Sequence, residues 1–173
     1  MPVKGTRCVC YCRDCQAFLA HLERSDIADA AGGTDLFQTM PDRVQVVKGA
    51  EHLAALRLSD KGPIRWYADC CDTPICNTGA SRTVPLASFL VDFFDRPEAT
   101  GPIVARVNRK GARGQIEGDA GNVKRLIARF LGGAALALLT GRYRRTPFFD
   151  GSGRPVAEPK RLTDEERDRA YRG

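Results

Sequence analysis

The first clear pattern along the chain is an alternation of cysteine with other residues between Arg7 and Cys12. Successive side chains of a β-strand point to opposite faces, so a repeat of two residues predicts a strand with one buried face. Beyond Cys15 the apolar residues recur at intervals of three and four, which predicts a short helix that begins near Gln16. The cysteines expected to share one face of the strand are Cys8, Cys10 and Cys12.

Short β-type runs separated by glycine and proline follow this segment. Because such runs with turn signals between them are typical of consecutive strands, they favour an antiparallel meander. The expected fold class is therefore mainly β. The strands are predicted at residues 36–38, 44–47, 53–58, 64–68, 84–94 and 103–107.

The pattern changes near the C-terminus, where apolar residues repeat at three and four positions from Val123 to Leu139. This spacing predicts a long amphipathic helix that ends before Gly141. The sequence Thr163-Asp-Glu-Glu166 is a capping box, which predicts a short terminal helix. We therefore expect a β domain over residues 1–115 and a C-terminal helical extension with a tail over residues 116–173.

Length and hydropathy narrow the class of protein. A chain of 173 residues fits one compact domain with an extension. The longest strongly apolar stretch, Phe130 to Leu139, is shorter than the roughly 20 residues that a membrane-spanning helix needs, so we expect no membrane span. The first residues contain no apolar run of signal-peptide length, which predicts a cytoplasmic protein.

The formal net charge is +6, and the excess of basic residues lies after residue 100. A basic run there includes Arg106, Arg109, Lys110 and Arg113. This run has no interleaved aromatic residues on which bases could stack, so we interpret it as a solvated loop and do not expect a nucleic-acid partner. The sequence favours no particular oligomeric state.

The cysteines carry the strongest chemical signal. Four of the seven fall within eight residues, too close together for a disulfide framework. A C-x-C pair followed by C-x-x-C across a turn brings three thiolates within the roughly 4 Å that Zn–S bonds of about 2.3 Å require. We therefore predict one zinc ion bound by Cys10, Cys12 and Cys15. The alternative is that these cysteines are small buried apolar side chains.

The fourth ligand decides what such a zinc ion could do. If water or a substrate thiol occupies the fourth position, the ligand can exchange, whereas a fourth protein sulfur would make the site structural. We expect Cys71 to be the protein residue that could fill this position. The other cysteines that could do so are Cys8, Cys70 and Cys76.

The cysteine run, Gln16-Ala-Phe after it, and Cys71-Asp72-Thr73-Pro74-Ile75 further on resemble the glutathione-dependent formaldehyde-activating enzyme family, which includes centromere protein V. The resemblance covers residues 7 to about 110. It implies a β-tent fold and a zinc site at Cys10, Cys12 and Cys15 that binds a glutathione adduct. The family's other zinc site uses a distant C-x-x-C-G-T-P motif, and here Ala68 and Asp72 replace one cysteine and the glycine.

We weigh two functions, and the resemblance implies the first of them. In the first, zinc binds the sulfur of a small thiol, or of a glutathione aldehyde adduct, and the protein is a carbon–sulfur lyase. In the second, the zinc only stabilises a binding or scaffold module, and the C-terminal helix docks a partner. The sequence identifies no catalytic general base.

Overall fold

The computed structural model describes residues 4–173, and the described part is mainly β, as predicted. It contains one sheet of eight strands in the order β7-β1-β2-β6-β5-β4-β3-β8. The strands are β1 (Thr6–Cys10), β2 (Thr34–Thr39), β3 (Leu53–Arg57), β4 (Ile64–Ala68), β5 (Thr73–Thr78), β6 (Ala87–Leu90), β7 (Ile103–Val107) and β8 (Lys160–Arg161).

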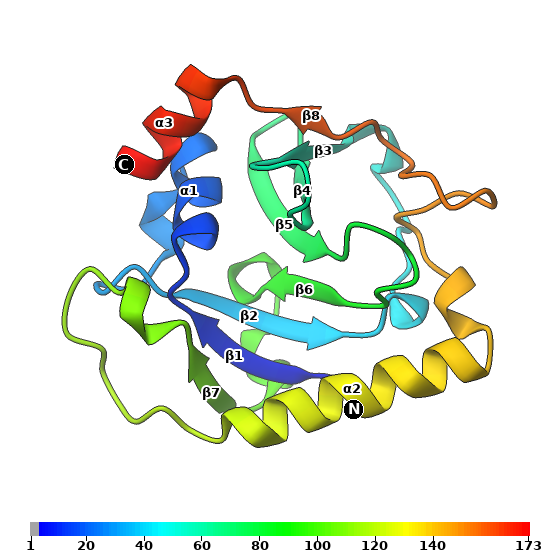
Figure 1. Cartoon of the computed structure of the whole chain (residues 1–173), viewed down its shortest axis with the longest axis horizontal. Coiled ribbons are helices and arrows are strands. Elements are labelled where there is room, and N and C mark those ends of the chain that lie inside the picture. Colours follow the sequence, from blue (N-terminus) through cyan, green and yellow to red (C-terminus); the bar gives the residue numbers. More distant parts are fainter. Residues whose placement is uncertain (1–3) are drawn as a thin grey trace.

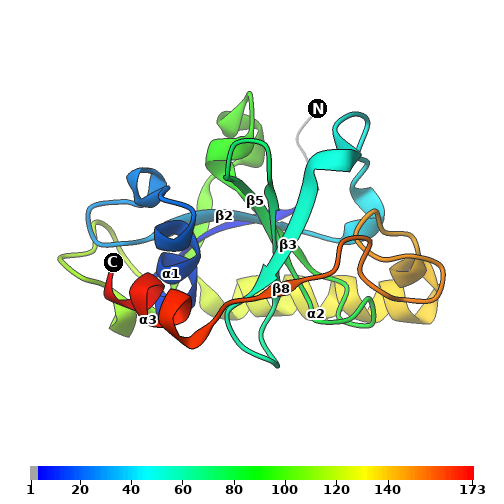
Figure 2. The same ribbon diagram turned by 90° about the horizontal axis from the view of Figure 1, so that it is seen from above.

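Three α-helices occur in the same residues, and short 3-10 helices join several strands. The α-helices are α1 (Arg13–His21), α2 (Val123–Leu139) and α3 (Asp164–Arg172). The 3-10 helices are η1 (Ser25–Ile27), η2 (Pro41–Arg43), η3 (Ala50–His52), η4 (Val91–Phe93), η5 (Pro97–Thr100), η6 (Arg109–Gly111) and η7 (Arg142–Arg144). Figures 1 and 2 show α3 beside α1, while α2 runs along β1 and β7.

Of the predicted meander, the antiparallel pairing of the runs at 53–58 and 64–68 is confirmed by β3 and β4. Strand β5, which no pattern in the sequence predicted, pairs antiparallel with both β4 and β6. The sheet continues through β2, which is antiparallel to both β6 and β1. Parallel partners close the two ends, because β7 pairs with β1 and β8 pairs with β3. The first strand therefore lies inside the sheet, and the chain leaves it directly into α1.

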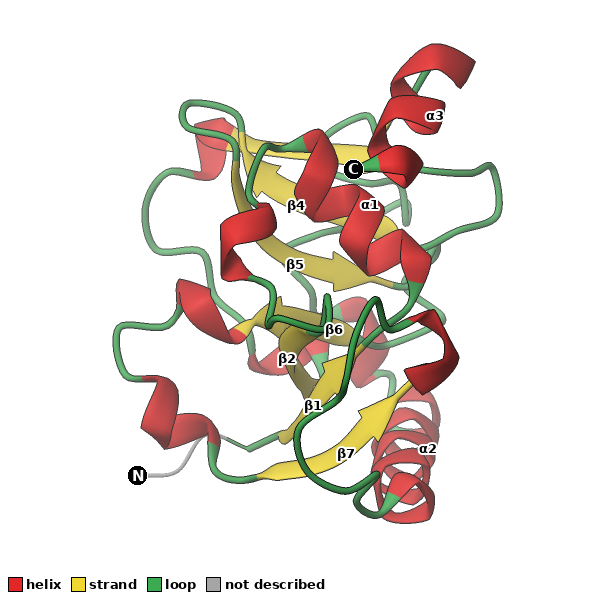
Figure 3. Ribbon diagram, turned by 90° about the vertical axis from the view of Figure 1, so that its left-hand side faces the viewer, coloured by secondary structure: helices red, strands yellow, loops and turns green. Residues whose placement is uncertain are grey.

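The main core lies between one face of the sheet and the helices. Helix α1 contributes its buried face to this core and lies across β4 and β5 in Figure 3. Strands from both halves of the sheet meet it there, through Leu36 of β2 and Leu56 of β3, for example. A second cluster on the opposite face contains Trp66, whose ring centroid lies 5.1 Å from that of Phe148. Both faces of the central strands are therefore buried.

Several strand boundaries differ from the sequence prediction. Residues 44–47 do not form a strand: Val47 is 83% exposed in a loop, and the segment pairs with no strand of the described residues. The run 84–94 contains only β6, which is followed at once by η4. Cys12 has left the strand and caps α1, so only Cys8 and Cys10 share the buried face.

The helices near the C-terminus form where their patterns predict them. Helix α2 spans Val123–Leu139, and the capping box at the start of α3 is complete, since Thr163 Oγ1 accepts from the Glu166 N–H at 3.1 Å. The segment after residue 115 packs as part of the same fold, with β8 in the sheet and α3 against α1. Within residues 4–173, no helix is long and apolar enough to cross a bilayer.

The packing of α1 on the sheet should dominate the stability of this half of the molecule. Leu19 is 1% exposed, so Leu19→Ala should lower the free energy of unfolding by about 2–5 kcal/mol through lost burial and a cavity. The matched control is Leu131→Ala on α2, where the side chain is 57% exposed and the loss should stay within about 0.5 kcal/mol. Urea denaturation of both variants measures the difference; equal losses would contradict the packing described here.

Candidate metal centre

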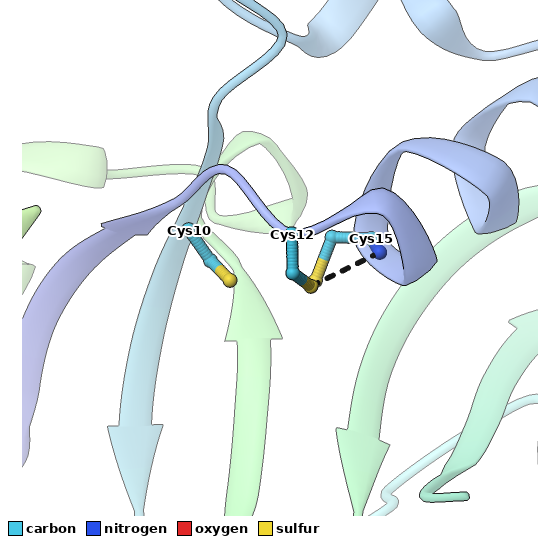
Figure 4. A group of neighbouring side chains, drawn as sticks. All are labelled: Cys10, Cys12 and Cys15. Atoms are coloured by element: carbon cyan, nitrogen blue, oxygen red, sulfur yellow. Dashed lines mark hydrogen bonds between the residues drawn. The ribbon is translucent and has the colours of Figure 1, made fainter. Parts of the chain in front are cut away.

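Three thiols converge where β1 gives way to α1. Cys10 is the last residue of β1, Cys12 is the N-cap of α1, and Cys15 lies in the first turn of that helix. Figure 4 shows the three side chains gathered on one side of the turn, and their sulfur atoms all lie within 4.8 Å of one another. Four ligands on Zn–S bonds of about 2.3 Å would be roughly 3.8 Å apart, so this group fits a tetrahedral ion after a small contraction.

The helix start positions two of the three sulfurs. Cys12 has extended backbone angles and its Sγ accepts the N–H of Cys15 at 3.3 Å, the role that serine or aspartate often has at an N-cap. The first-turn N–H groups and the helix dipole favour negative charge at this point. A thiolate is therefore stabilised by the same geometry that begins the helix.

The turn between strand and helix is fixed from outside by η6. A Cβ atom on Gly111 would lie 2.3 Å from the carbonyl oxygen of Tyr11, so only glycine permits this close approach. Gln16 ties the two segments together, since its Nε2 donates to Tyr11 O at 3.0 Å and to Gly111 O at 2.9 Å. The cysteine turn is thus held by a buried amide and not by the cysteines alone.

Asn108 makes the most direct contact with a cluster sulfur from outside the motif. Its Nδ2 donates to Cys10 Sγ at 3.2 Å, and its backbone adopts the left-handed conformation at φ 56°. Asparagine tolerates that conformation better than most residues, because its side chain is short and polar. This amide stabilises negative charge on Cys10.

Arg65 of β4 places a buried positive charge beside the cluster. The residue is 2% exposed, and its Nη1 lies 3.9 Å from Cys15 Sγ and donates to Asn77 Oδ1 at 3.0 Å. Its guanidinium also stacks over Phe18, while the nearest carboxylate, that of Asp14, is 4.0 Å away and half exposed. Since a buried charge needs a counter-charge, an anionic thiolate cluster is the natural partner of Arg65.

The thiols differ strongly in pKa. Hydrogen bonds from Cys12 and Cys15, with Asn108 as a further donor, lower the pKa of Cys10 to about 2 despite its burial. The hydrogen bond to Cys10 raises the pKa of Cys12, and hydrogen bonds to Cys10 and Cys12 raise that of Cys15 well above its ordinary value. The hydrogen bonds within the cluster therefore favour a thiolate at Cys10, and a bound cation would favour deprotonation of the other two thiols.

The structure does not bring Cys71 into this group. Its side chain is exposed on the turn between β4 and β5, where the sulfur lies next to Cys70 and Thr73. Cys8 faces the core, and burial raises its pKa to about 12, while Cys76 is buried in the cluster on the opposite sheet face. In the part of the chain that the structure describes, no fourth histidine, cysteine or carboxylate joins the three sulfurs.

The motif residues were found from their spacing, but three supporting residues were not: Arg65, Asn108 and Gly111. Arg65 lies in the predicted strand at 64–68. A single charged residue in that otherwise apolar run could have indicated a buried charge. Asn108 and Gly111 are distant in sequence and reach the site only because β7 pairs in parallel with β1.

A family model described as "Family of unknown function (DUF6151)" matches residues 1–160. No curated protein and no solved structure matches the chain.

The buried guanidinium generates a prediction about metal affinity. Arg65→Met removes the positive charge beside Cys15, which should raise the thiol pKa values and weaken zinc binding at neutral pH by roughly 10- to 100-fold. Competition with a chromophoric chelator measures this change. The control is Arg161→Met, whose side chain is 66% exposed on β8 and pairs with Asp60. Equal affinities in the two variants would show that Arg65 does not support the site.

Proposed function

The chain belongs to the DUF6151 family, whose function is unknown, and from this premise we propose that it is a zinc protein whose metal binds small thiols or their aldehyde adducts. The observation that carries the proposal is the convergence of Cys10, Cys12 and Cys15 without a fourth protein ligand among the described residues. Three protein ligands with one position left for an outside ligand is the usual arrangement of catalytic zinc.

Zinc is the favoured metal because thiolates are soft ligands and the group is compact. A zinc ion with three thiolates and neutral water carries one net negative charge, which Arg65 can balance. An incoming thiol that loses its proton adds a second negative charge, and the cation offsets part of that cost. The same residue would therefore hold the site together and ease the binding of a thiolate.

The reaction class that fits this arrangement is carbon–sulfur bond formation or cleavage. When bound, the metal supplies Lewis acidity to the sulfur or to an aldehyde oxygen. In the addition direction, a sulfur–carbon bond forms at the carbonyl carbon and the oxygen takes a proton. Near the site, the pKa of Tyr171 is raised to about 12 by burial and by its hydrogen bond to Asp14, so this hydroxyl stays protonated.

The resemblance to the glutathione-dependent formaldehyde-activating enzymes agrees with this proposal. It rests on the same three cysteines, on Gln16, which holds the cysteine turn, and on the distal segment from Cys71 to Ile75. We extend the proposal to the fold: the curved sheet would be a diverged β-tent that keeps the exchangeable zinc site and has lost the other one. Exposed Cys70 and Cys71, with Ala68 in place of a cysteine, support that loss.

A second candidate function is a zinc-stabilised scaffold, and one observation favours it. Helix α2 leaves large apolar side chains in contact with solvent, which suits a docking surface better than an isolated enzyme. These residues are Ile127, Leu131, Leu136, Leu138 and Leu139. In the scaffold, the zinc would only join β1 to α1, and added thiols would leave the metal unchanged.

Metal content tests the ligand set. Cys10→Ser, Cys12→Ser and Cys15→Ser should each reduce bound zinc well below one equivalent, because two thiolates bind the ion far more weakly than three. Cys71→Ser is the matched control and should retain full zinc, since its sulfur lies outside the group. Elemental analysis after purification without added metal gives the result. Loss of zinc from Cys71→Ser would show that Cys71 is a metal ligand after all.

Ligand exchange separates the enzyme from the scaffold. In cobalt-substituted protein, a millimolar small thiol should increase the sulfur-to-cobalt charge-transfer absorption, because a fourth sulfur replaces water. The thioether analogue of the same compound is the control and should cause no change. An unchanged spectrum with the thiol would remove the lyase proposal and favour the scaffold.

A further inference from the structure

A second pair of thiols lies away from the metal centre, on the turn between β4 and β5. Cys70 and Cys71 are both exposed, and their sulfur atoms are 3.5 Å apart, with the Cys70 thiol donating to Cys71. We call these two residues the vicinal pair. The turn is closed by a hydrogen bond from the Cys71 N–H to the Ala68 carbonyl at 3.4 Å.

The two cysteines of the vicinal pair are the most accessible to a dissolved reagent. Cys12 is half-buried, and its sulfur accepts a helix N–H. The remaining cysteines are at most 6% exposed: Cys8, Cys10, Cys15 and Cys76. A reagent that modifies accessible thiols should therefore act on the β4–β5 turn before it reaches the core.

The two sulfurs of the pair are not equivalent. Cys71 Sγ lies 3.1 Å from Thr73 Oγ1 and also accepts the thiol proton of Cys70, and both contacts stabilise a thiolate. The pKa of Cys71 is accordingly lowered, first by Thr73, while the pKa of Cys70 is raised, first by Cys71. Cys71 is thus suited to attack a disulfide first, and Cys70 is suited to attack the mixed disulfide that results.

From this geometry we propose that the vicinal pair is a site of reversible thiol–disulfide exchange with low-molecular-weight disulfides that are neutral or positively charged. The Cys71 thiolate attacks one sulfur of the disulfide, a mixed disulfide forms, and a thiolate leaves and takes a proton from solvent. Cys70 then loses its proton and attacks Cys71 Sγ, which releases the second thiol. Two protein thiols are oxidised and one disulfide is reduced to two thiols.

The charge preference follows from the residues on either side of the pair. Asp69 and Asp72 flank it, and both carboxylates oppose negative charge on the sulfurs. The Asp69 carboxylate lies 3.3 Å from Nδ1 of His52. An anionic disulfide such as oxidised glutathione is repelled by this turn, whereas a cationic one such as cystamine is attracted.

Treatment of the full-length protein with cystamine, followed by alkylation and trypsin, tests the site. Cleavage after Arg65 and Arg82 yields one peptide with Cys70, Cys71 and the buried Cys76 as an internal reference. We expect this peptide to lose two hydrogens through a Cys70–Cys71 bond, while Cys76 is alkylated only after unfolding. A wild-type protein that does not react there, or that stops at the mixed disulfide, would overturn the proposal.

Single variants test the order of attack. Cys70→Ser should stop at a stable mixed disulfide on Cys71, whereas Cys71→Ser should react at least about threefold more slowly than wild type. Both changes lie on an exposed turn, so circular dichroism should show an unaltered fold. Equal reaction rates in the two variants would contradict the assigned roles.

The charge preference has its own control. Wild-type protein should react with cystamine at least about threefold faster than with oxidised glutathione, after correction for the reactivity of each reagent with a free thiol. Asp72→Asn should reduce that ratio by roughly twofold, and asparagine tolerates the left-handed backbone at φ 49°. A ratio near one in wild type would remove the charge preference.

Discussion

The burial of α1 against the sheet is the interaction on which the rest of the molecule depends. Its apolar face, with Phe18 and Leu19, joins strands from both halves of the sheet into one core. Because the helix must begin within two residues of β1, its N-terminus lies directly over the end of that strand. The three cysteine sulfurs are brought together by this change of direction. The candidate metal centre is therefore a consequence of how the core is built.

Electrostatics gives that site its chemical character. An arginine with 2% exposure is rare unless it has a counter-charge, and within residues 4–173 Arg65 has no carboxylate closer than 4.0 Å. The helix N-terminus and the amide of Asn108 act in the same direction, since each favours thiolate over thiol. Three independent elements thus stabilise negative charge at one point. If the cysteines were only small buried apolar side chains, no such stabilisation of negative charge would be needed.

The local patterns of the sequence predicted most of the helices and strands, although they did not predict β5 or β8. The alternating cysteines, the apolar repeat of α2 and the capping box of α3 each reflect contacts between residues close in the chain, and all three elements formed. The prediction of a strand at residues 44–47 was wrong, because β-type composition cannot show whether another strand is available for pairing. Cys12 was assigned to the strand because alternation continues through it, although its sulfur instead caps α1.

Long-range contacts were beyond local patterns. The parallel pairing of β7 with β1 brings Asn108 and Gly111 to the cysteine turn, and no spacing rule indicates that pairing. The same limit explains Cys71, because its place in a family motif indicated a ligand while the β4–β5 turn holds it at the surface. Arg65 was missed because both faces of β4 are buried, so alternation could not show which side met the site.

The central claim is that three sulfurs bind one divalent ion and leave a position for an outside ligand. X-ray absorption at the zinc edge of protein purified without added metal tests it most directly. The account predicts about one zinc per chain, with three sulfur neighbours at about 2.3 Å and one oxygen or nitrogen at about 2.0 Å. Four sulfur neighbours, or no stoichiometric metal, would contradict it.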